Sequence, residues 1–194
     1  MKLDIILSGV GGQGILSIAT VIGEAATAAG LSLKQAEVHG MSQRGGDVQS
    51  NLRLSTEEIY SDLIPVGKAD LIIAMEPMEA LRYVPYLAAD GQIVSSSQPF
   101  VNIPNYPDQK ALADELAALP HYLGLDIETL AKENQMPRGA NMILLGMAAP
   151  FLKILSEQQL RDAIGRIFAA KGEAVVASNQ AAFDLGCARA KEAR

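Results

Sequence analysis

Two glycine-rich segments hold the residues of this sequence that are best suited to bind a negatively charged group. Residues 9–14 read Gly-Val-Gly-Gly-Gln-Gly, and residues 44–46 read Arg-Gly-Gly. The spacing of the glycines in residues 9–14 permits a tight turn and lets a ligand approach the backbone closely. An arginine beside glycines offers a planar fork of N–H donors that suits carboxylate or phosphate. Both segments therefore predict contact with an anion.

The first glycine segment stands between a predicted strand and a predicted helix. Ile5, Ile6 and Leu7 form the short apolar run of a buried parallel strand, and apolar residues recur at helical spacing over 15–29. Free amides at a helix start, with the positive end of the helix dipole behind them, attract phosphate or carboxylate. The alternative is a tight turn without a ligand. We expect the cofactor-binding residues of this segment to be Gly9, Gly11, Gly12, Gln13 and Gly14.

Two polar side chains near this segment leave the nature of the ligand open. The Gln13 amide supplies both a donor and an acceptor, although a capping or solvent-facing glutamine has the same signature. Glu37 lies near the end of a predicted strand over 33–38, about twenty residues after the glycine turn, where NAD-binding folds hold the ribose hydroxyl. The alternative for Glu37 is a carboxylate that caps or pairs with a neighbouring loop.

The second glycine segment follows that second predicted strand. We expect Arg44, Gly45 and Gly46 to join the ligand-binding residues, because loops at the carboxyl ends of parallel strands share one edge of a sheet. The two glycine segments would then face the same crevice. The alternative is a solvated turn with an exposed arginine.

The rest of the chain alternates strands and helices. We expect strands over 48–54, 69–75, 92–96 and 122–125, and helices over 76–88, 107–119 and 126–133. Pro85 predicts a kink or a shortening of its helix. Ser156 and Gln159 form a capping box for a helix that ends at Lys171-Gly172. These elements predict a single α/β domain over 1–194, a Rossmann-like three-layer sandwich whose mostly parallel sheet has helices on both faces and a helical C-terminal part.

Composition limits the classes of function. The 194 residues are 49% hydrophobic, so the chain can bury roughly 70% of the surface that its unfolded form exposes. A net charge of −6 argues against non-specific nucleic-acid binding. No apolar stretch reaches membrane-spanning length and no signal peptide precedes the first strand, so we expect a cytoplasmic protein. The apolar stretch 140–152 must be covered by the domain's own core or by a partner subunit.

The cysteine and histidine content restricts redox and metal chemistry on this chain. Cys187 is the one cysteine, so the chain forms no internal disulfide and lacks the four thiolates of an iron–sulfur cluster. We expect it to be a small core residue rather than a nucleophile. His39 and His121 stand far apart without companion ligands, so we expect no metal site and identify no catalytic residue.

The two glycine segments together resemble a known family. Residues 9–14 and the stretch His-Gly-Met-Ser-Gln-Arg-Gly-Gly over 39–46 are similar to the gamma-type module of the 2-oxoacid:ferredoxin oxidoreductases, most closely of the indolepyruvate group. Residues 70–77 resemble the family's next strand and loop, and residues 138–146 resemble its later helix start. The resemblance extends from about residue 4 to residue 186.

The resemblance implies a function shared with other chains. Members of this family oxidatively decarboxylate a 2-oxoacid on thiamine diphosphate, pass electrons through iron–sulfur clusters to ferredoxin, and transfer the acyl group to coenzyme A. This chain has no Gly-Asp-Gly diphosphate motif and one cysteine, so the resemblance implies a larger partner that carries the thiamine and cluster sites. The small subunit would hold coenzyme A phosphates with Gly11, Gly12, Gly14 and Arg44. We therefore expect Arg44→Ala to weaken the use of coenzyme A.

Two other functions remain open from the residues themselves. One is a free-standing NAD-dependent oxidoreductase that uses the first glycine segment and Glu37. The other is a regulatory or assembly module that binds a nucleotide without taking part in turnover.

Overall fold

Alternating burial along the strands creates the two faces of a central sheet. In the computed structural model, which describes residues 1–39 and 45–193, Ile5 and Leu7 of the first strand pack into one hydrophobic cluster and Ile6 packs into another. Successive side chains of a strand point to opposite faces, so a run that is apolar throughout must be covered on both sides. The first strand is therefore central to the fold.

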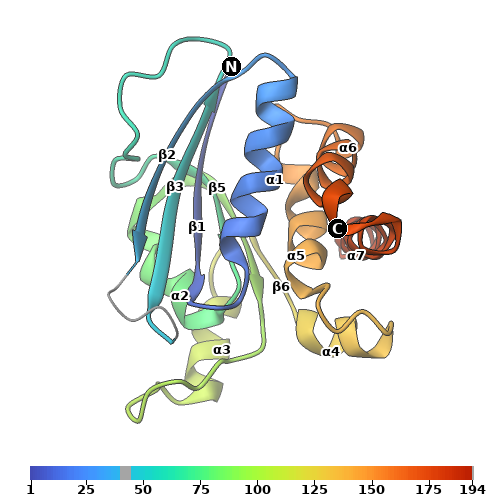
Figure 1. Ribbon diagram of the computed structural model, residues 1–194. Helices are drawn as coiled ribbons and strands as arrows, with labels where there is room; N and C mark the ends of the chain where they lie inside the picture. Colours follow the sequence, from blue (N-terminus) through green and yellow to red (C-terminus); the bar gives the residue numbers. More distant parts are fainter. Residues whose placement is uncertain (40–44, 194) are drawn as a thin grey trace.

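The described strands form one sheet in the order β2-β3-β1-β4-β5-β6 (Figure 1). Their bounds are β1 (Lys2–Val10), β2 (Ser32–His39), β3 (Asp47–Ser55), β4 (Ala69–Ala74), β5 (Leu87–Ser96) and β6 (Tyr122–Leu125). β1, β4, β5 and β6 are parallel neighbours, whereas β3 is antiparallel to both β1 and β2. The predicted mostly parallel α/β sheet is confirmed. β3 enters it as a hairpin with β2 and separates β2 from β1.

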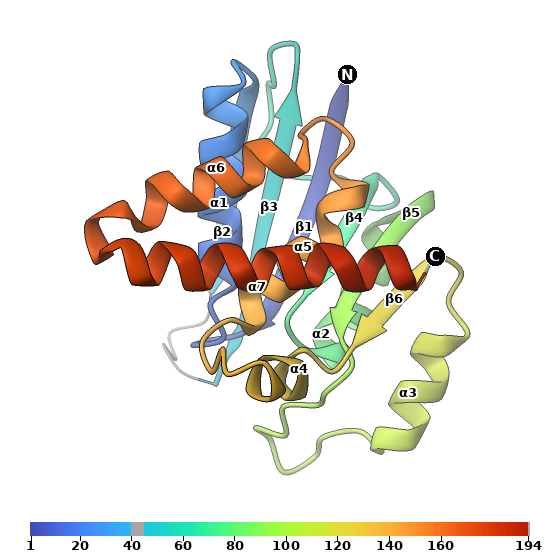
Figure 2. The same ribbon diagram turned by 90° about the vertical axis from the view of Figure 1, so that its right-hand side faces the viewer.

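Helices cover both faces of this sheet. Their bounds are α1 (Ile15–Ala28), α2 (Pro77–Arg82), α3 (Gln109–Ala117), α4 (Ile127–Glu133), α5 (Ala140–Ala148), α6 (Glu157–Phe168) and α7 (Glu173–Glu192), with 3-10 turns at Val84–Tyr86, Ala149–Phe151 and Ala169–Lys171. α1 and α5 lie against one face, and α2 and α3 lie against the other (Figure 1). Figure 2 shows α6 and α7 in front of α1 and α5, as an additional outer layer. The predicted helical C-terminal part is that layer.

One predicted helix is wrong in extent. The expected helix over 76–88 ends at Arg82, a 3-10 turn follows, and β5 already starts at Leu87 rather than at residue 92. Pro85 lacks an N–H group and disfavours helical geometry at the preceding residue, so the helix cannot continue through it. The predicted shortening at Pro85 is confirmed.

Several other boundaries agree closely with the sequence. β6 has its predicted bounds, and α1 is followed by Gly30 in the left-handed conformation at φ 72°. Ser156 and Gln159 make both hydrogen bonds of the predicted capping box at the start of α6. Among the described helices, none is long and apolar enough to cross a membrane.

The apolar stretch after residue 140 is covered by the domain itself. All residues of α5 except Asn141 are buried, and α7 crosses the outer side of that helix (Figure 2). The two helices approach closely because Gly146 and Gly186 face each other, with each ideal Cβ position 2.1 Å or less from a carbonyl oxygen of the opposite helix. Of the two predicted coverings, the domain's own core is the observed one.

Candidate functional site

The two glycine segments meet at one edge of the sheet. The Gly11 amide donates to the Gly46 carbonyl at 2.8 Å, and the Gly45 amide donates to the Gly11 carbonyl at 3.5 Å. This edge is the lower end of the sheet in Figure 1, where β1 ends and β3 begins. The expected juxtaposition of the two segments is confirmed. Arg44 lies outside the described residues.

The first glycine segment leaves the start of α1 without a protein cap. Gly14 is the N-cap residue in the left-handed conformation, none of the described side chains accepts from the amides of the first turn, and that turn has no acidic residue. Gly12 has φ 103°, and an ideal Cβ there would meet no atom within 4 Å. A helix start with open amides and no acidic residue in its first turn favours an anion.

The remaining two predicted residues of this segment have contacts inside the fold. The Gln13 side chain accepts from the Val10 amide at 2.8 Å and donates to the Met75 carbonyl at 3.4 Å, so its amide group closes its own turn. Gly9 is buried within β1, and an ideal Cβ there would lie 3.0 Å from the Met75 Cβ. Gly9 thus permits close packing between strand β1 and the residue after β4.

A second helix start faces the same glycine turn. The Asn141 side chain, in the first turn of α5, donates to the Gly14 carbonyl at 3.2 Å. The N-cap residue of α5 is Gly139, which offers no side-chain cap, and no acidic residue lies in that first turn. The starts of α1 and α5 are therefore side by side, and both present the positive end of a helix dipole.

These elements surround a cleft of about 830 Å³. Two cations, Lys132 of α4 and Arg138 before α5, line it with exposed side chains, and neither forms an ion pair with another described residue. Glu128 supplies one negative charge at the same cleft. The site residues that the sequence analysis missed are thus Lys132, Arg138 and Asn141. The stretch 138–146 marked a helix start, but only the packing of α5 beside α1 brings it to the glycine turn.

Another wall of the cleft comes from the end of β5 and the loop after it. Ser96, Gln98, Pro99 and Phe100 line this wall. The buried Ser96 hydroxyl accepts from the Gln98 amide at 3.2 Å, and Phe100 is 47% exposed. Ser96 and Gln98 therefore supply polar groups to this wall.

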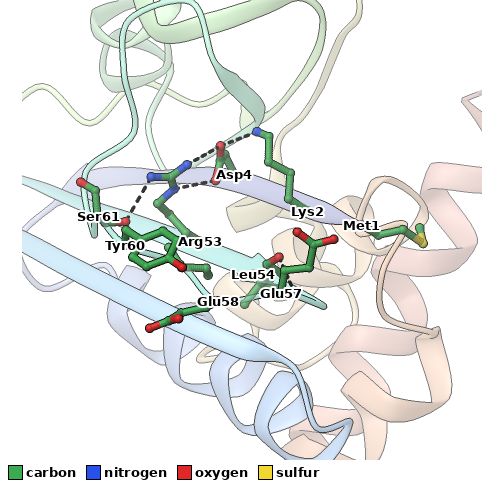
Figure 3. A pocket seen from close by; sticks show the side chains of 11 residues that line it. Met1, Lys2, Asp4, Arg53, Leu54, Glu57, Glu58, Tyr60 and Ser61 are labelled. Atoms are coloured by element: carbon green, nitrogen blue, oxygen red, sulfur yellow. Dashed lines mark hydrogen bonds and ion pairs between the residues drawn. The ribbon is translucent and has the colours of Figure 1, made fainter.

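A separate cavity near the start of β1 is built around a structural ion pair. The Asp4 carboxylate accepts from the Arg53 guanidinium at 2.8 Å and from the Lys2 ammonium at 2.6 Å (Figure 3). Arg53 also donates to the Ser61 and Leu63 carbonyls, which fixes the loop after β3. Burial alone would raise the pKa of Asp4, but the two cations outweigh it and hold this pKa below its usual value. The charges of Asp4, Arg53 and Lys2 are paired within the fold, so the cleft beside the two glycine segments is the better candidate site.

The described residues place no metal-binding group of three or more His, Cys, Asp or Glu side chains together. Cys187 is 5% exposed on α7, and burial raises the pKa of its thiol to about 12. A thiol that stays protonated is a poor nucleophile. The interpretation of Cys187 as a core residue agrees with this burial.

The position of Glu37 does not favour a dinucleotide. In a dinucleotide-binding fold the acidic residue ends the strand next to β1, where it reaches the ribose. Here β3 lies between β1 and β2, and the Glu37 carboxylate accepts from the Gln35 side chain at 2.6 Å. The hairpin therefore removes Glu37 from the place that an NAD site requires.

Comparison with solved structures finds the same fold in enzymes that act on 2-oxoacids. The 2-oxoglutarate:ferredoxin oxidoreductase from Magnetococcus marinus, solved with 2-oxoglutarate, coenzyme A and succinyl-CoA bound, matches with a TM-score of 0.77 and 26% identity over 98% of this chain and 31% of that chain. The keto/oxoacid ferredoxin oxidoreductase gamma subunit from Geobacter sulfurreducens matches with a TM-score of 0.71 and 23% identity over 98% and 99%. The second likeness supports the fold alone.

Sequence comparison gives the family. The indolepyruvate oxidoreductase subunit IorB of Thermococcus kodakarensis is 36% identical over 98% of this chain and 97% of the relative. The subunit of the same name from Pyrococcus horikoshii is 35% identical over the same shares. A family model described as pyruvate ferredoxin/flavodoxin oxidoreductase matches residues 4–189. With nearly the whole length matched, the chain belongs to the pyruvate ferredoxin/flavodoxin oxidoreductase family.

Proposed function

We propose that this chain is the small subunit of a 2-oxoacid:ferredoxin oxidoreductase of the indolepyruvate type, and that its cleft binds the phosphates of coenzyme A. Similarity to two indolepyruvate oxidoreductase subunits along almost their full length supports the first part. The assembled enzyme would decarboxylate an arylpyruvate oxidatively, reduce ferredoxin and form an acyl-coenzyme A. The 2-oxoacid pocket would lie mainly on the partner.

The convergence of two helix starts and two cations, which no described side chain caps or pairs with, carries the ligand proposal. Backbone amides around Gly12 and Gly14 and the side chains of Lys132 and Arg138 are the donors that phosphate oxygens require. A cleft of about 830 Å³ also lies in the size range of small-molecule sites, roughly 300–1,000 Å³. Coenzyme A, when bound, supplies the thiol that accepts the acyl group. The residues present therefore fit its phosphate end.

The redox cofactors belong on a partner in this proposal. A single buried cysteine leaves no set of four thiolates on this chain, so thiamine diphosphate and the iron–sulfur clusters would be held by a larger subunit that reduces ferredoxin. We further propose that residues 1–194 act as one domain and that the enzyme works in the cytoplasm, where an unpaired cysteine stays reduced.

A calorimetric titration of coenzyme A tests the ligand proposal. We expect Arg138→Ala and Lys132→Ala each to weaken binding by about three- to tenfold, with a loss that shrinks at high salt. Arg44→Ala should act in the same direction. Lys153→Ala is the matched control, because Lys153 is exposed but lines a different cavity with Met1 and Lys2. Dephospho-coenzyme A, which lacks one phosphate, should bind more weakly than coenzyme A.

Other outcomes point to other functions. Equal binding by the wild type and both cleft variants would contradict the proposed ligand contacts. Tight NAD binding by the isolated chain would favour the free-standing oxidoreductase. A ligand whose removal leaves turnover of the complex intact would favour a regulatory or assembly module.

A further inference from the structure

Glu76 is a buried carboxylate that lies outside the glycine segments and the cleft lining. It is the N-cap residue of α2, and its side chain accepts from the Glu79 amide at 2.9 Å. The residue is 0% exposed. Its other carboxylate oxygen accepts from the Phe100 amide at 3.3 Å and from the Tyr106 hydroxyl. Three donors from two elements therefore meet on one side chain.

The loop between β5 and α3 depends on few polar contacts. Among the described residues, the hydrogen bonds that tie residues 99–106 to the rest of the fold go to Glu76 and to the Gly45 carbonyl. The second of these is donated by the Asn102 side chain at 2.7 Å. Phe100 of this loop lines the cleft. The position of that cleft wall is therefore set at one end by Glu76 and at the other by the Gly45 carbonyl.

The contacts continue into the first glycine segment. Asn102 holds the Gly45 carbonyl, and the next carbonyl, that of Gly46, accepts from the Gly11 amide at 2.8 Å. We propose that Glu76 is a positioning residue for the cleft, because its carboxylate anchors the loop that carries Phe100 and Asn102 and thereby fixes Gly45-Gly46 against Gly11. The role in coenzyme A use rests on the proposed function; the positioning of Gly45-Gly46 does not.

The chemistry of the three contacts explains why a carboxylate is needed. An ionised carboxylate is acceptor-only and can receive all three donors, whereas a glutamine would turn an NH₂ group toward at least one of them. A buried donor without a partner is costly, so the loop or the first turn of α2 would move to relieve it. Burial and the hydrogen bond to Glu76 raise the pKa of Tyr106 above its usual range, so its hydroxyl remains a donor at neutral pH.

Hydrogen exchange of the full chain and kinetics of its complex test this role. We expect Glu76→Gln, and more mildly Tyr106→Phe, to speed exchange of the Gly11 amide by about tenfold. In the complex, KM for coenzyme A should rise by a similar factor while KM for the 2-oxoacid stays unchanged. Ser156→Ala is the control, since it also removes a helix N-cap but on α6 in the outer layer. It should leave both readouts as in the wild type.

The two readouts separate this inference from the proposed ligand. Unchanged Gly11 exchange in Tyr106→Phe, with faster exchange confined to residues 99–106, would overturn the positioning role even if coenzyme A binds. Faster Gly11 exchange in a chain that does not bind coenzyme A would uphold the positioning role and contradict the ligand. Tyr106→Phe removes one oxygen atom and keeps the test valid if Glu76→Gln does not fold.

Discussion

At the scale of single residues, Gly12 and Gly14 meet different constraints although both have positive φ. An alanine Cβ at Gly14 would lie 2.8 Å from the Asn141 side-chain nitrogen, whereas at Gly12 it would meet nothing within 4 Å. We expect Gly14→Ala to lower the free energy of unfolding by about 2–3 kcal/mol, and Gly12→Ala by about 1 kcal/mol from backbone strain alone. Urea unfolding of both variants measures the difference.

A double-mutant cycle identifies the source of the Gly14 cost. Asn141→Ala removes the side chain that an alanine at position 14 would strike, so the two substitutions together should cost less than their sum. Strictly additive effects would contradict the contact. Gly12→Ala should still impair coenzyme A binding, because Gly12 lines the cleft and an added methyl group there would occupy open space.

The sequence predicted the glycine residues of the site but not its two cations. The spacing of Gly9, Gly11 and Gly14 predicted a turn before a helix, since that spacing is a local property of the backbone. Arg138 and Lys132 carry no such local pattern. Their place at the cleft depends on how α4 and α5 pack beside α1, which no short motif encodes.

At the scale of secondary-structure elements, the contact between α5 and α7 rests on two facing glycines. An ideal Cβ at Gly186 would lie 2.0 Å from the Ile143 carbonyl oxygen, and one at Gly146 would lie 2.1 Å from the Phe183 carbonyl oxygen. Because helix backbones yield little, we expect Gly186→Ala and Gly146→Ala each to destabilise the fold by about 3 kcal/mol. Thermal unfolding measures this loss.

Gly165→Ala in α6 is the matched control for that contact. Its ideal Cβ comes no closer than 3.4 Å to a flexible glutamine side chain, and alanine favours a helix over glycine by about 0.5–1 kcal/mol. This control should be neutral or slightly stabilising. A similar loss of stability in all three variants would contradict the role of Gly146 and Gly186 in close packing between α5 and α7.

Some helices and strands of the fold could be predicted from the sequence, whereas the pairing of others could not. β6, α4 and the capping box of α6 follow from local signals, namely a short apolar run, an Asp cap and a Ser-Gln pair. The antiparallel insertion of β3 does not, because strand polarity is decided by pairing. The apolar pattern of residues 48–54 is equally compatible with either direction.

At the scale of the whole molecule, acid stability should depend on the Asp4 ion pair. The cations beside it hold the pKa of Asp4 below its usual value, so its stabilisation is fully present above that value, near 3.8, and is lost as pH falls through the lower native pKa. At pH 7, Asp4→Asn should cost about 3 kcal/mol, because it leaves Arg53 without its buried partner. This difference from the wild type should shrink below about pH 4.

Urea unfolding between pH 2 and pH 7 measures that difference. Asp62→Asn is the control, since Asp62 is exposed and has no ion pair with another described residue. A difference between wild type and Asp4→Asn that stays constant down to the lowest pH would contradict a depressed native pKa.

The distribution of cysteine predicts how the whole assembly divides its work. An iron–sulfur cluster normally needs four thiolates, and this chain has one cysteine, which is buried in α7. We therefore expect the isolated chain to fold and bind coenzyme A while containing no iron and reducing no ferredoxin. Co-purification with its larger partner should restore 2-oxoacid-dependent ferredoxin reduction, and Cys187→Ala should keep the iron content of that complex unchanged. Iron bound by the isolated chain, or lost on Cys187→Ala, would contradict this division, because the thiolates would then come from more than one polypeptide.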